Sequence, residues 1–425
     1  MDILTKSLAG IVGSTHVMDC PPDALPASWK GCICVTASPS DTVEIQEIVR
    51  LLEHDYAGSG IIPVGAGLQL AAGYPPPADR PLVLLSLHRM NRITDHQPDD
   101  MTVTAEPGVT FAQCDAAIAT SRQMLGIDVP RPERATLGGS VAVASHGLRR
   151  VRYGAVRDTL IGLKAVMQAG TEIKGGGKVV KNVAGYDLCK LFTGSYGSLG
   201  VLTEVTFRVH PCPEVRRTLA WHVPDAATAA RVGLELHHAR LAHTMLFVHG
   251  NGTDGYRLII GFDGIEKRVN WQEAQATSIA ATAGLNDGPE VINTEALLKF
   301  QNAPADVLEN AQAAARISGL VTALPSMLQR LQVANPSLLS ADISTGLVQI
   351  ALDTNSHAGT QLVMNTLTAV GPEANLTWHH LECPETLAAL PRWGVQGPPL
   401  RLHRGIKASL DTSNLFSPNR FPGKA

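Results

Sequence analysis

Residues 175–188 read GGGKVVKNVAGYDL, and residues 194–204 read GSYGSLGVLTE. Both runs are rich in glycine, and they place a Lys-Asn pair and a Tyr-Asp pair ahead of a segment of alternating residues. The alternation of Val201, Thr203 and Val205 predicts a half-buried strand over residues 201–209. This much glycine is hard to explain by loops alone, and the strand edge after Gly200 could present main-chain donor and acceptor groups to a flat heterocyclic ligand.

Two other glycine segments precede this one. Residues 61–69 read IIPVGAGLQ, in which a strand runs into Gly-x-Gly, a turn suited to directing backbone N–H groups at phosphate oxygens. The dinucleotide pattern GxGxxG is not met, because Leu70 stands at the third glycine. Residues 130–145 read PRPERATLGGSVAVAS, where Thr136 is predicted to cap a helix of small residues whose free N–H groups face a ligand. Taken alone, either segment also fits a plain tight turn or a closely packed helix.

The remaining sequence pattern divides the chain into two parts that differ in the order of their predicted strands and helices. The first half alternates short elements, with strands predicted at 32–37, 60–64, 82–87, 101–105, 160–167 and 201–209 and helices at 41–52, 110–121 and 188–192. After residue 213 the order strand, helix, strand, strand occurs twice, at 217–222, 226–238, 244–249 and 256–262, and again at 317–323, 326–333, 338–343 and 346–352. Helices at 266–283 and 357–370 follow the two sets. Such a duplication predicts one antiparallel sheet with helices on one face, in the ferredoxin-like manner.

Composition restricts the function classes. A chain of 425 residues exceeds the usual size of one domain. Its net charge of −3 and 4% aromatic content argue against a nucleic-acid partner. No run of about 20 apolar residues predicts a transmembrane segment, and the N-terminal residues are too weakly apolar for a signal peptide. Seven scattered cysteines without a CxxC pair predict reduced thiols, a cytoplasmic location and no metal or iron–sulfur ligand set.

These glycine segments, together with RYGAVRD at 152–158, resemble the vanillyl-alcohol-oxidase-type (PCMH-type) FAD-binding family. More closely, they resemble the family of E subunits of bacterial glycolate oxidases, the smaller of two FAD-binding subunits. The motifs cover residues 30–213, and the tail at 400–421, with NLFSPNRF at 414–421, is similar to the C-terminal segment of that family. The stretch between them matches only in the order of its elements.

The resemblance implies an α+β protein with three parts. Residues 1–213 would form a PCMH-type FAD-binding domain of two subdomains. Residues 214–397 would form a ferredoxin-like α+β cap domain, and residues 398–425 a C-terminal segment that returns to the FAD-binding domain. FAD would lie between the two subdomains.

The resemblance also assigns cofactor contacts. The pyrophosphate would bind the main chain of 64–69, residues 136–142 would pass along the cofactor, and the main chain at 200–201 would meet the adenine or the flavin edge. Asn182 is the polar residue of the third segment that we expect near the cofactor. The predicted FAD contacts are Val64, Gly65, Ala66, Gly67, Leu68, Gln69, Thr136, Leu137, Gly138, Gly139, Ser140, Ala142, Asn182, Gly200 and Val201.

Three departures from the family refine the expectation. Leu68 and Gln69 cannot form a covalent flavin bond, so FAD is expected to be non-covalent. Tyr196 stands where catalytic relatives carry the acid of a Gly-Ser-Glu-Gly segment. Residues 249–255, HGNGTDG, fit a hairpin turn better than the His-rich cap motif of those relatives. The catalytic base is therefore unassigned, and His379-His380 is only a nominal candidate.

The leading expectation is an FAD-dependent oxidoreductase acting on the CH–OH group of 2-hydroxy acids, glycolate or D-lactate. It would be the non-principal flavin subunit of a glycolate oxidase, beside a larger catalytic FAD subunit and an iron–sulfur subunit. The chain would be cytoplasmic, or peripheral to the inner membrane through that complex. Two alternatives stay open. One is a self-sufficient FAD-dependent enzyme acting on another alcohol or hydroxy acid, and the other is an assembly subunit that has lost FAD.

Overall fold

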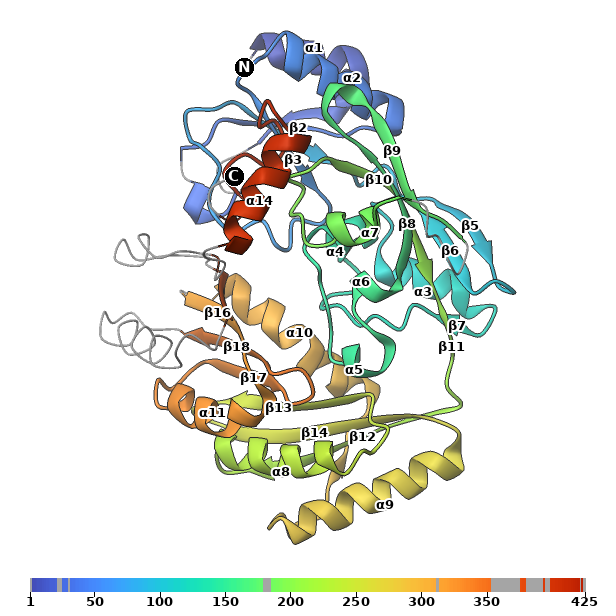
Figure 1. Ribbon diagram of the computed structural model, residues 1–425, viewed down its shortest axis with the longest axis vertical. Coiled ribbons are helices and arrows are strands. Elements are labelled where there is room, and N and C mark those ends of the chain that lie inside the picture. The colour runs from blue at the N-terminus through green and yellow to red at the C-terminus, as the bar shows by residue number, and fades with distance from the viewer. Residues whose placement is uncertain are drawn as a thin grey trace. The chain divides into compact units, whose positions relative to one another are not determined.

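The computed structural model describes residues 2–20, 25–29, 31–178, 185–310, 313–352, 375–379, 393, 398–420 and 422. The chain folds into two compact units, each described by itself below (Figure 1). The first unit comprises residues 1–146, 155–212 and 395–425, and the second comprises 147–154 and 213–394.

The first unit begins with a four-stranded sheet covered by two helices. Its strands lie in the order β1 (Val17–Asp19), β2 (Cys34–Ala37), β4 (Leu82–Ser86) and β3 (Gly60–Val64), with β2, β4 and β3 parallel. Helices α1 (Asp2–Val12) and α2 (Thr42–His54) pack their apolar residues on one face, beside Val35, Ile61 and Val83. Asp41 caps α2 by accepting from the N–H groups of Val43 and Glu44.

A five-stranded antiparallel sheet completes the first unit. Its order is β5 (Ile93–Gln97), β6 (Thr102–Ala105), β10 (Val201–Arg208), β8 (Leu160–Val166) and β9 (Glu172–Gly176). Its core face packs on α3 (Phe111–Ala119), α4 (Leu137–Ala142) and α7 (Leu188–Phe192). Short elements link these pieces: β7 (Gln123–Met124), which pairs with β11 (His210–Pro211), and α6 (Val156–Thr159). Val166 and Val201 join the core of the four-stranded sheet, so the two sheets share a hydrophobic boundary.

Residues 398–420 also belong to the first unit. Helix α14 (Pro398–Leu410) is followed by an extended segment, and Phe416 pairs in parallel with Ile61 of β3. The amide of Ile61 donates to Leu415 O, and that of Ser417 donates to Ile61 O. The segment therefore extends the first sheet next to the strand that carries the first glycine loop.

The second unit is built from two strand–helix–strand–strand repeats. The first contains β12 (Val215–Val223), α8 (Ala226–His238), β13 (Met245–Asn251) and β14 (Gly255–Gly264). The second contains β16 (Ala313–Ser318), α11 (Leu324–Gln332), β17 (Leu338–Asp342) and β18 (Leu347–Leu352). Strands β13 and β17 join the repeats into an eight-stranded sheet of order β15-β12-β14-β13-β17-β18-β16-β19, completed by β15 (Glu290–Val291) and β19 (Asn375–His379). The predicted duplication is confirmed.

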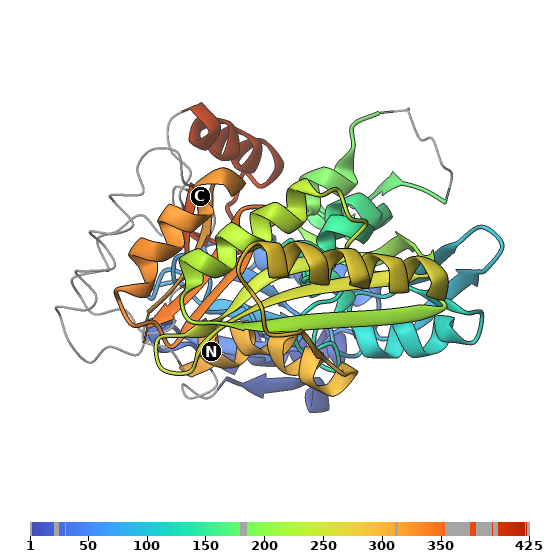
Figure 2. The ribbon, with the colours of Figure 1, turned by 90° about the horizontal axis from the view of Figure 1, so that it is seen from below.

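Helices cover both faces of this sheet, so the expectation of helices on one face only is wrong. Helices α8, α11 and α9 (Glu266–Thr282) bury one face, and Figure 2 shows α8 and α9 lying across it. Helix α10 (Thr294–Asn310) packs on the other face, where Leu297 and Phe300 meet Phe247. Helix α5 (Arg150–Tyr153) also belongs to this unit, because Tyr153 donates a 2.7 Å hydrogen bond to the buried Asp263.

Most predicted elements of the first half are confirmed, but three features differ from the expectation. The strand predicted at 317–323 is β16 at 313–318, and residues 321–323 form a helical turn. Strand β9, which contains Gly175 and Gly176, was not predicted. Helices α1 and α10 were not predicted. The helix predicted at 357–370 lies outside the described residues.

The hairpin predicted at 249–255 is confirmed, and it gives the second unit an acid-sensitive group. Burial, followed by the charge of Arg257, lowers the pKa of His249 from 6.5 to about 4. Between pH 6.5 and pH 4 His249 therefore binds a proton in the unfolded chain but not in the folded chain. The free energy of unfolding consequently falls as the pH drops through this range. We expect His249→Gln to remove roughly 2–3 kcal/mol of this acid destabilisation, as measured by urea unfolding at pH 7 and pH 4.5. Substituting the exposed His238 should leave the pH dependence unchanged.

Candidate functional site

The loop that follows β3 presents a run of open backbone donors. Among the described residues, the amides of Gly65, Ala66, Gly67, Leu68 and Gln69 donate no hydrogen bond, whereas those of Leu70 and Ala72 bond back to Gly67 O and Gln69 O. Gly67 has a φ of +75°, which only glycine adopts without strain. Consecutive free amides in a turn of this kind form a concave anion site suited to a diphosphate.

The second glycine segment forms α4, and its N-terminus is closed. Thr136 caps the helix through the Gly139 amide, as predicted. However, the amides of Leu137 and Gly138 donate to Val109 O and Pro107 O, and that of Ser140 donates to Thr136 O. The expectation of free N–H groups at this helix start is wrong, because the extended segment before α3 already accepts them. The helix can therefore offer a ligand its small-residue surface, but not these donors.

The three glycine segments meet in the first unit. A Cβ placed on Gly65 would overlap Oγ1 of Thr136, so the first loop lies directly against the cap of α4. At the other end of α4, Val141 O and Ala142 O accept from the amides of Gly194 and Tyr196, at 3.0 and 2.8 Å. A Cβ on Gly197 would lie 3.0 Å from Pro63 of β3. Segments more than 100 residues apart in sequence thus close a ring of contacts.

Close packing, as well as access for a ligand, accounts for the glycines of the third segment. A Cβ on Gly200 would lie 2.6 Å from Val166 O, and one on Gly175 would overlap Leu188. Val201 is fully buried and pairs with Val166 of β8. On the opposite edge of β10, β6 pairs only with residues 205–208, so the main chain at 201–204 has no strand partner there among the described residues. Asn182 lies outside the described residues.

Side chains of α14 and of the segment that follows it hold the site in place. Arg420, only 4% exposed, donates from Nη2 to Leu70 O and Ala72 O at 2.8 Å each, and its guanidinium lies 4.6 Å from the Trp29 ring centroid. The buried Nζ of Lys407 donates to Ser198 O at 2.8 Å, to Phe416 O at 2.6 Å and to Asp411. The two cations thus hold the first loop and the third segment. In the sequence, Lys407 and Arg420 stood out only as part of the C-terminal segment that carries the resemblance. The i,i+4 spacing of Lys407 and Asp411 was the one local signal of a supporting role for Lys407.

Arg420 yields a prediction about ligand affinity. Burial lowers the pKa of Arg420 to about 10, so the guanidinium stays charged at neutral pH. Arg420→Met removes the guanidinium, so Leu70 O and Ala72 O lose this hydrogen-bond donor and the end of the loop after β3 is no longer held. We expect about tenfold weaker FAD binding, measured by quenching of flavin fluorescence in the apoprotein. Arg420→Lys should fall in between, because an ammonium lacks the planar fork. Arg401→Met, at an exposed position of α14, is the matched control.

The described residues contain no group of three His, Cys, Asp or Glu side chains able to hold a metal ion. Burial raises the pKa of Cys114 to about 12 and that of Cys189 to about 11, which keeps both thiols protonated. Among the parts of the chain described here, no helix is long and apolar enough to cross a membrane.

Comparison with known proteins assigns the ligand. Residues 34–176, which include the open amide loop and α4, match the family described as FAD binding domain. This part of the chain is thus similar to an FAD-binding domain. FAD is the cofactor of the chain, and the open amides and tight glycine contacts of the first unit fit a dinucleotide.

Curated relatives of this FAD-binding domain match only part of the chain. Glycolate oxidase subunit GlcD of Bacillus subtilis is 38% identical over 43% of this chain and 38% of that protein. Glycolate oxidase subunit GlcE of Escherichia coli is 42% identical over 30% of this chain and 37% of that protein. D-lactate dehydrogenase of Archaeoglobus fulgidus is 30% identical over 54% of this chain and 50% of that protein. The matches therefore span half or less of the length of these relatives.

Solved structures extend the likeness to nearly the whole chain. p-Cresol methylhydroxylase aligns with a TM-score of 0.74 at 16% identity, covering 99% of this chain and 96% of that one. Alkyldihydroxyacetonephosphate synthase aligns with a TM-score of 0.73 at 17% identity, covering 98% of this chain and 84% of that one. These likenesses confirm the predicted fold class, a PCMH-type FAD-binding fold with an α+β cap and a returning C-terminal segment.

Proposed function

We propose that this chain is an FAD-dependent oxidoreductase of small 2-hydroxy acids, and that it works as a subunit of a glycolate-oxidase-type complex. The observation that carries the proposal is the ring of contacts among the three glycine segments, with five open amides in its first loop. Relatives named as glycolate oxidase subunits and as a D-lactate dehydrogenase support glycolate or D-lactate as the substrate.

The chain's residues would bind and orient the cofactor. The amides of residues 65–69 would hold its diphosphate, with Thr136 and the small residues Leu137 to Ala142 alongside. The free edge of β10 at Gly200 and Val201 would meet its ring system. Leu68 and Gln69 offer no covalent link, so FAD would be bound non-covalently. When bound, FAD supplies a hydride acceptor, which allows the C2–H of a 2-hydroxy acid to leave as hydride while the hydroxyl loses its proton.

A division of labour follows from what these segments lack. Residues 64–69 and 136–142 carry no acidic, basic or imidazole side chain, and Tyr196 replaces the acid found in catalytic relatives. The base that takes the hydroxyl proton would therefore lie elsewhere. We assign the principal turnover to a larger FAD subunit, with an iron–sulfur subunit to accept electrons. The complex would be cytoplasmic or peripheral to the inner membrane.

Anaerobic reduction of the flavin tests this proposal. The tagged chain should purify yellow, should release its FAD on acid precipitation, and should bleach slowly with glycolate or D-lactate unless the two partner subunits are present. Fast bleaching of the chain alone would favour a self-sufficient enzyme. Protein that stays colourless after incubation with FAD would favour an assembly role and overturn the proposal.

A further inference from the structure

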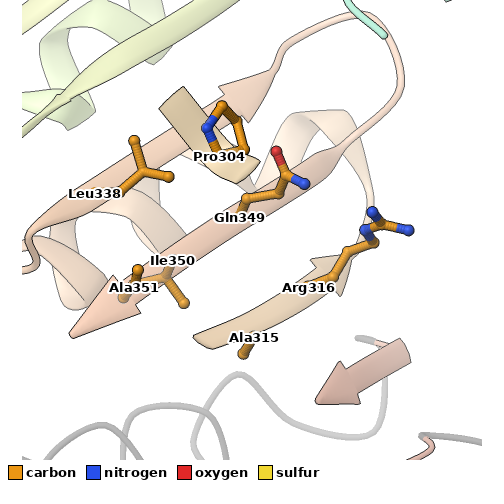
Figure 3. Close-up of a pocket in the computed structure, with 7 residues that line it drawn as sticks. All are labelled: Pro304, Ala315, Arg316, Leu338, Gln349, Ile350 and Ala351. Atoms are coloured by element: carbon orange, nitrogen blue, oxygen red, sulfur yellow. The ribbon is translucent and has the colours of Figure 1, made fainter. Parts of the chain in front are cut away.

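A pocket among β16, β17 and β18 of the second unit is too small for a substrate. Figure 3 shows its lining, which includes Arg316 of β16, Gln349 of β18 and Pro304 of α10. Its volume of about 10 Å³ leaves room for one water molecule at most. The chemistry that the proposed function leaves unused lies instead among the thiols of the first unit.

Three cysteines lie together on the face of the four-stranded sheet that α1 and α2 leave uncovered. Cys34 of β2 is 7% exposed, and Cys20 and Cys32 are half-buried beside it in the same hydrophobic cluster. Val64 and Leu70, at the two ends of the open amide loop, also pack against this cluster. Packing alone accounts for the buried Cys34, but not for two further half-buried thiols next to it.

The pairing of β1 with β2 sets two of these cysteines opposite each other. Asp19 pairs with Val35, so the next position along the ladder places Cys20 across from Cys34. Directly opposed residues of antiparallel strands lie on one face, with Cβ atoms about 4.5–5.5 Å apart, against about 3.8 Å in a disulfide. A movement of about 1 Å therefore joins the two sulfur atoms. Cys20 can make this movement because β1 ends at Asp19.

The contacts of the three sulfur atoms distinguish their roles. Sγ of Cys32 donates to Pro76 O at 3.8 Å, which ties this thiol to a different segment. Cys20 shares a hydrogen bond with the side chain of Thr36, two residues beyond Cys34 on the same strand face. Burial, followed by the charges of Cys20 and Cys32, raises the pKa of Cys34 to about 12. Cys20 is thus the more accessible thiol, and Cys34 is the buried thiol within its reach.

We propose that Cys20 and Cys34 form a reversible disulfide, with a small disulfide such as oxidised glutathione as the oxidant. The Cys20 thiolate attacks one sulfur of glutathione disulfide and releases one glutathione. The Cys34 thiolate then attacks the Cys20 sulfur of the mixed disulfide and releases the second glutathione. Two electrons pass from the cysteines to the glutathione sulfurs, and the two cysteine protons leave on the released thiols. The site does not depend on the substrate proposed above.

The disulfide would fasten the part of the chain that carries Trp29. The Trp29 ring contacts the guanidinium of Arg420, which holds Leu70 O and Ala72 O at the end of the open amide loop. A link between residues 20 and 34 restricts the unfolded chain, because it closes the loop between them. Oxidation should therefore stabilise the first unit and slow the release of FAD.

Thiol counting on the FAD-loaded full chain tests the site. After incubation with oxidised glutathione at pH 8.5, two of the seven thiols should be lost to titration in denaturant, and dithiothreitol should restore them. The reaction should be faster at pH 8.5 than at pH 7, because burial raises the pKa of Cys20 and leaves little thiolate at neutral pH. Peptide mapping of the alkylated chain should identify the link between Cys20 and Cys34.

Three variants locate the link. Cys20→Ser and Cys34→Ala should form no internal disulfide, whereas Cys32→Ser, from the same cluster, is the matched control and should react like the wild type. Oxidised wild-type protein should melt about 6–10 °C higher than the reduced protein and should lose FAD in urea about threefold more slowly. Cys20→Ser, a change at a half-buried position that the fold tolerates, should show neither effect.

Three results would overturn the site. They are seven thiols that persist after the incubation, a glutathione adduct on Cys20 that never closes, and a link that joins Cys20 to Cys32 instead of Cys34. A correct link that leaves the melting temperature unchanged would overturn its fastening role. Since none of these measurements uses glycolate or D-lactate, failure here leaves the proposed function standing, and failure of the proposed function leaves this site standing.

Discussion

Lys407→Met is expected to lower the free energy of unfolding of the first unit by about 3–5 kcal/mol, because it leaves a buried carboxylate without its cation. Asp411 is 2% exposed and Lys407 is 4% exposed. Burial lowers the pKa of Lys407, and the nearby Asp411 opposes that shift, so the pair depends on its mutual attraction. The substitution also leaves Ser198 O and Phe416 O without the Nζ donor. Urea unfolding of the FAD-free chain at neutral pH measures the loss.

Two further variants sharpen this test. Lys190→Met removes an ion pair in the same unit, but Lys190 and Asp187 are each about half exposed, so its effect should stay below about 1 kcal/mol. The double variant Lys407→Met/Asp411→Leu should recover only part of the loss. Asp411 also accepts from the amides of Leu415 and Phe416, and leucine cannot replace that acceptor. Equal losses in the exposed and buried lysine variants would contradict this role.

Gly65→Ala is expected to weaken FAD binding about 100-fold. The added Cβ would overlap Oγ1 of Thr136, whose side chain cannot turn away without losing its bond to the Gly139 amide. The loop must then shift, and with the diphosphate bound as proposed, two misaligned amide–phosphate hydrogen bonds at about 1.5 kcal/mol each would account for the factor. Titrating the apoprotein with FAD and following flavin fluorescence gives the dissociation constant.

Two controls locate the cause of this loss. Gly10→Ala adds the same methyl group to α1, where nothing lies within 4 Å, and should leave FAD affinity unchanged. Thr136→Ala in the Gly65→Ala background removes the overlapping oxygen and should regain part of the affinity, despite the lost helix cap. An FAD affinity in Gly65→Ala equal to that of the wild type would show that this contact does not shape the loop.

Local chemistry explains what could be predicted from the sequence. Thr136 caps the helix expected from it, and Asp41 and Asp187 cap the helices predicted at 41–52 and 188–192, because a side-chain acceptor at a helix start acts within three residues. The alternation of Val201, Thr203 and Val205 places strand β10 correctly, but the prediction that it is half-buried is wrong, because six of its eight residues are buried between the layers of the unit. The tight contact between Gly65 and Thr136 was not, since sequence alone gives no distance between segments 70 residues apart.

Tertiary contacts explain what could not be predicted. Strand β16 reads AAARIS, an alanine-rich stretch with no strand preference, and its pairing with β18 overrides local tendency. Helix α10 contains Pro304, which hides the helical pattern. The closed start of α4 depends on carbonyls near residue 107, about 30 residues away.

The pairing of Phe416 with Ile61 has a consequence for biogenesis. A nascent chain synthesised as far as residue 397 contains every glycine segment but lacks Lys407, Arg420 and the strand that flanks β3. We therefore expect cofactor loading to follow translation of these residues rather than to accompany emergence of the N-terminal half. Ribosome-bound chains stalled before residue 398 should take up little flavin, even when it is abundant.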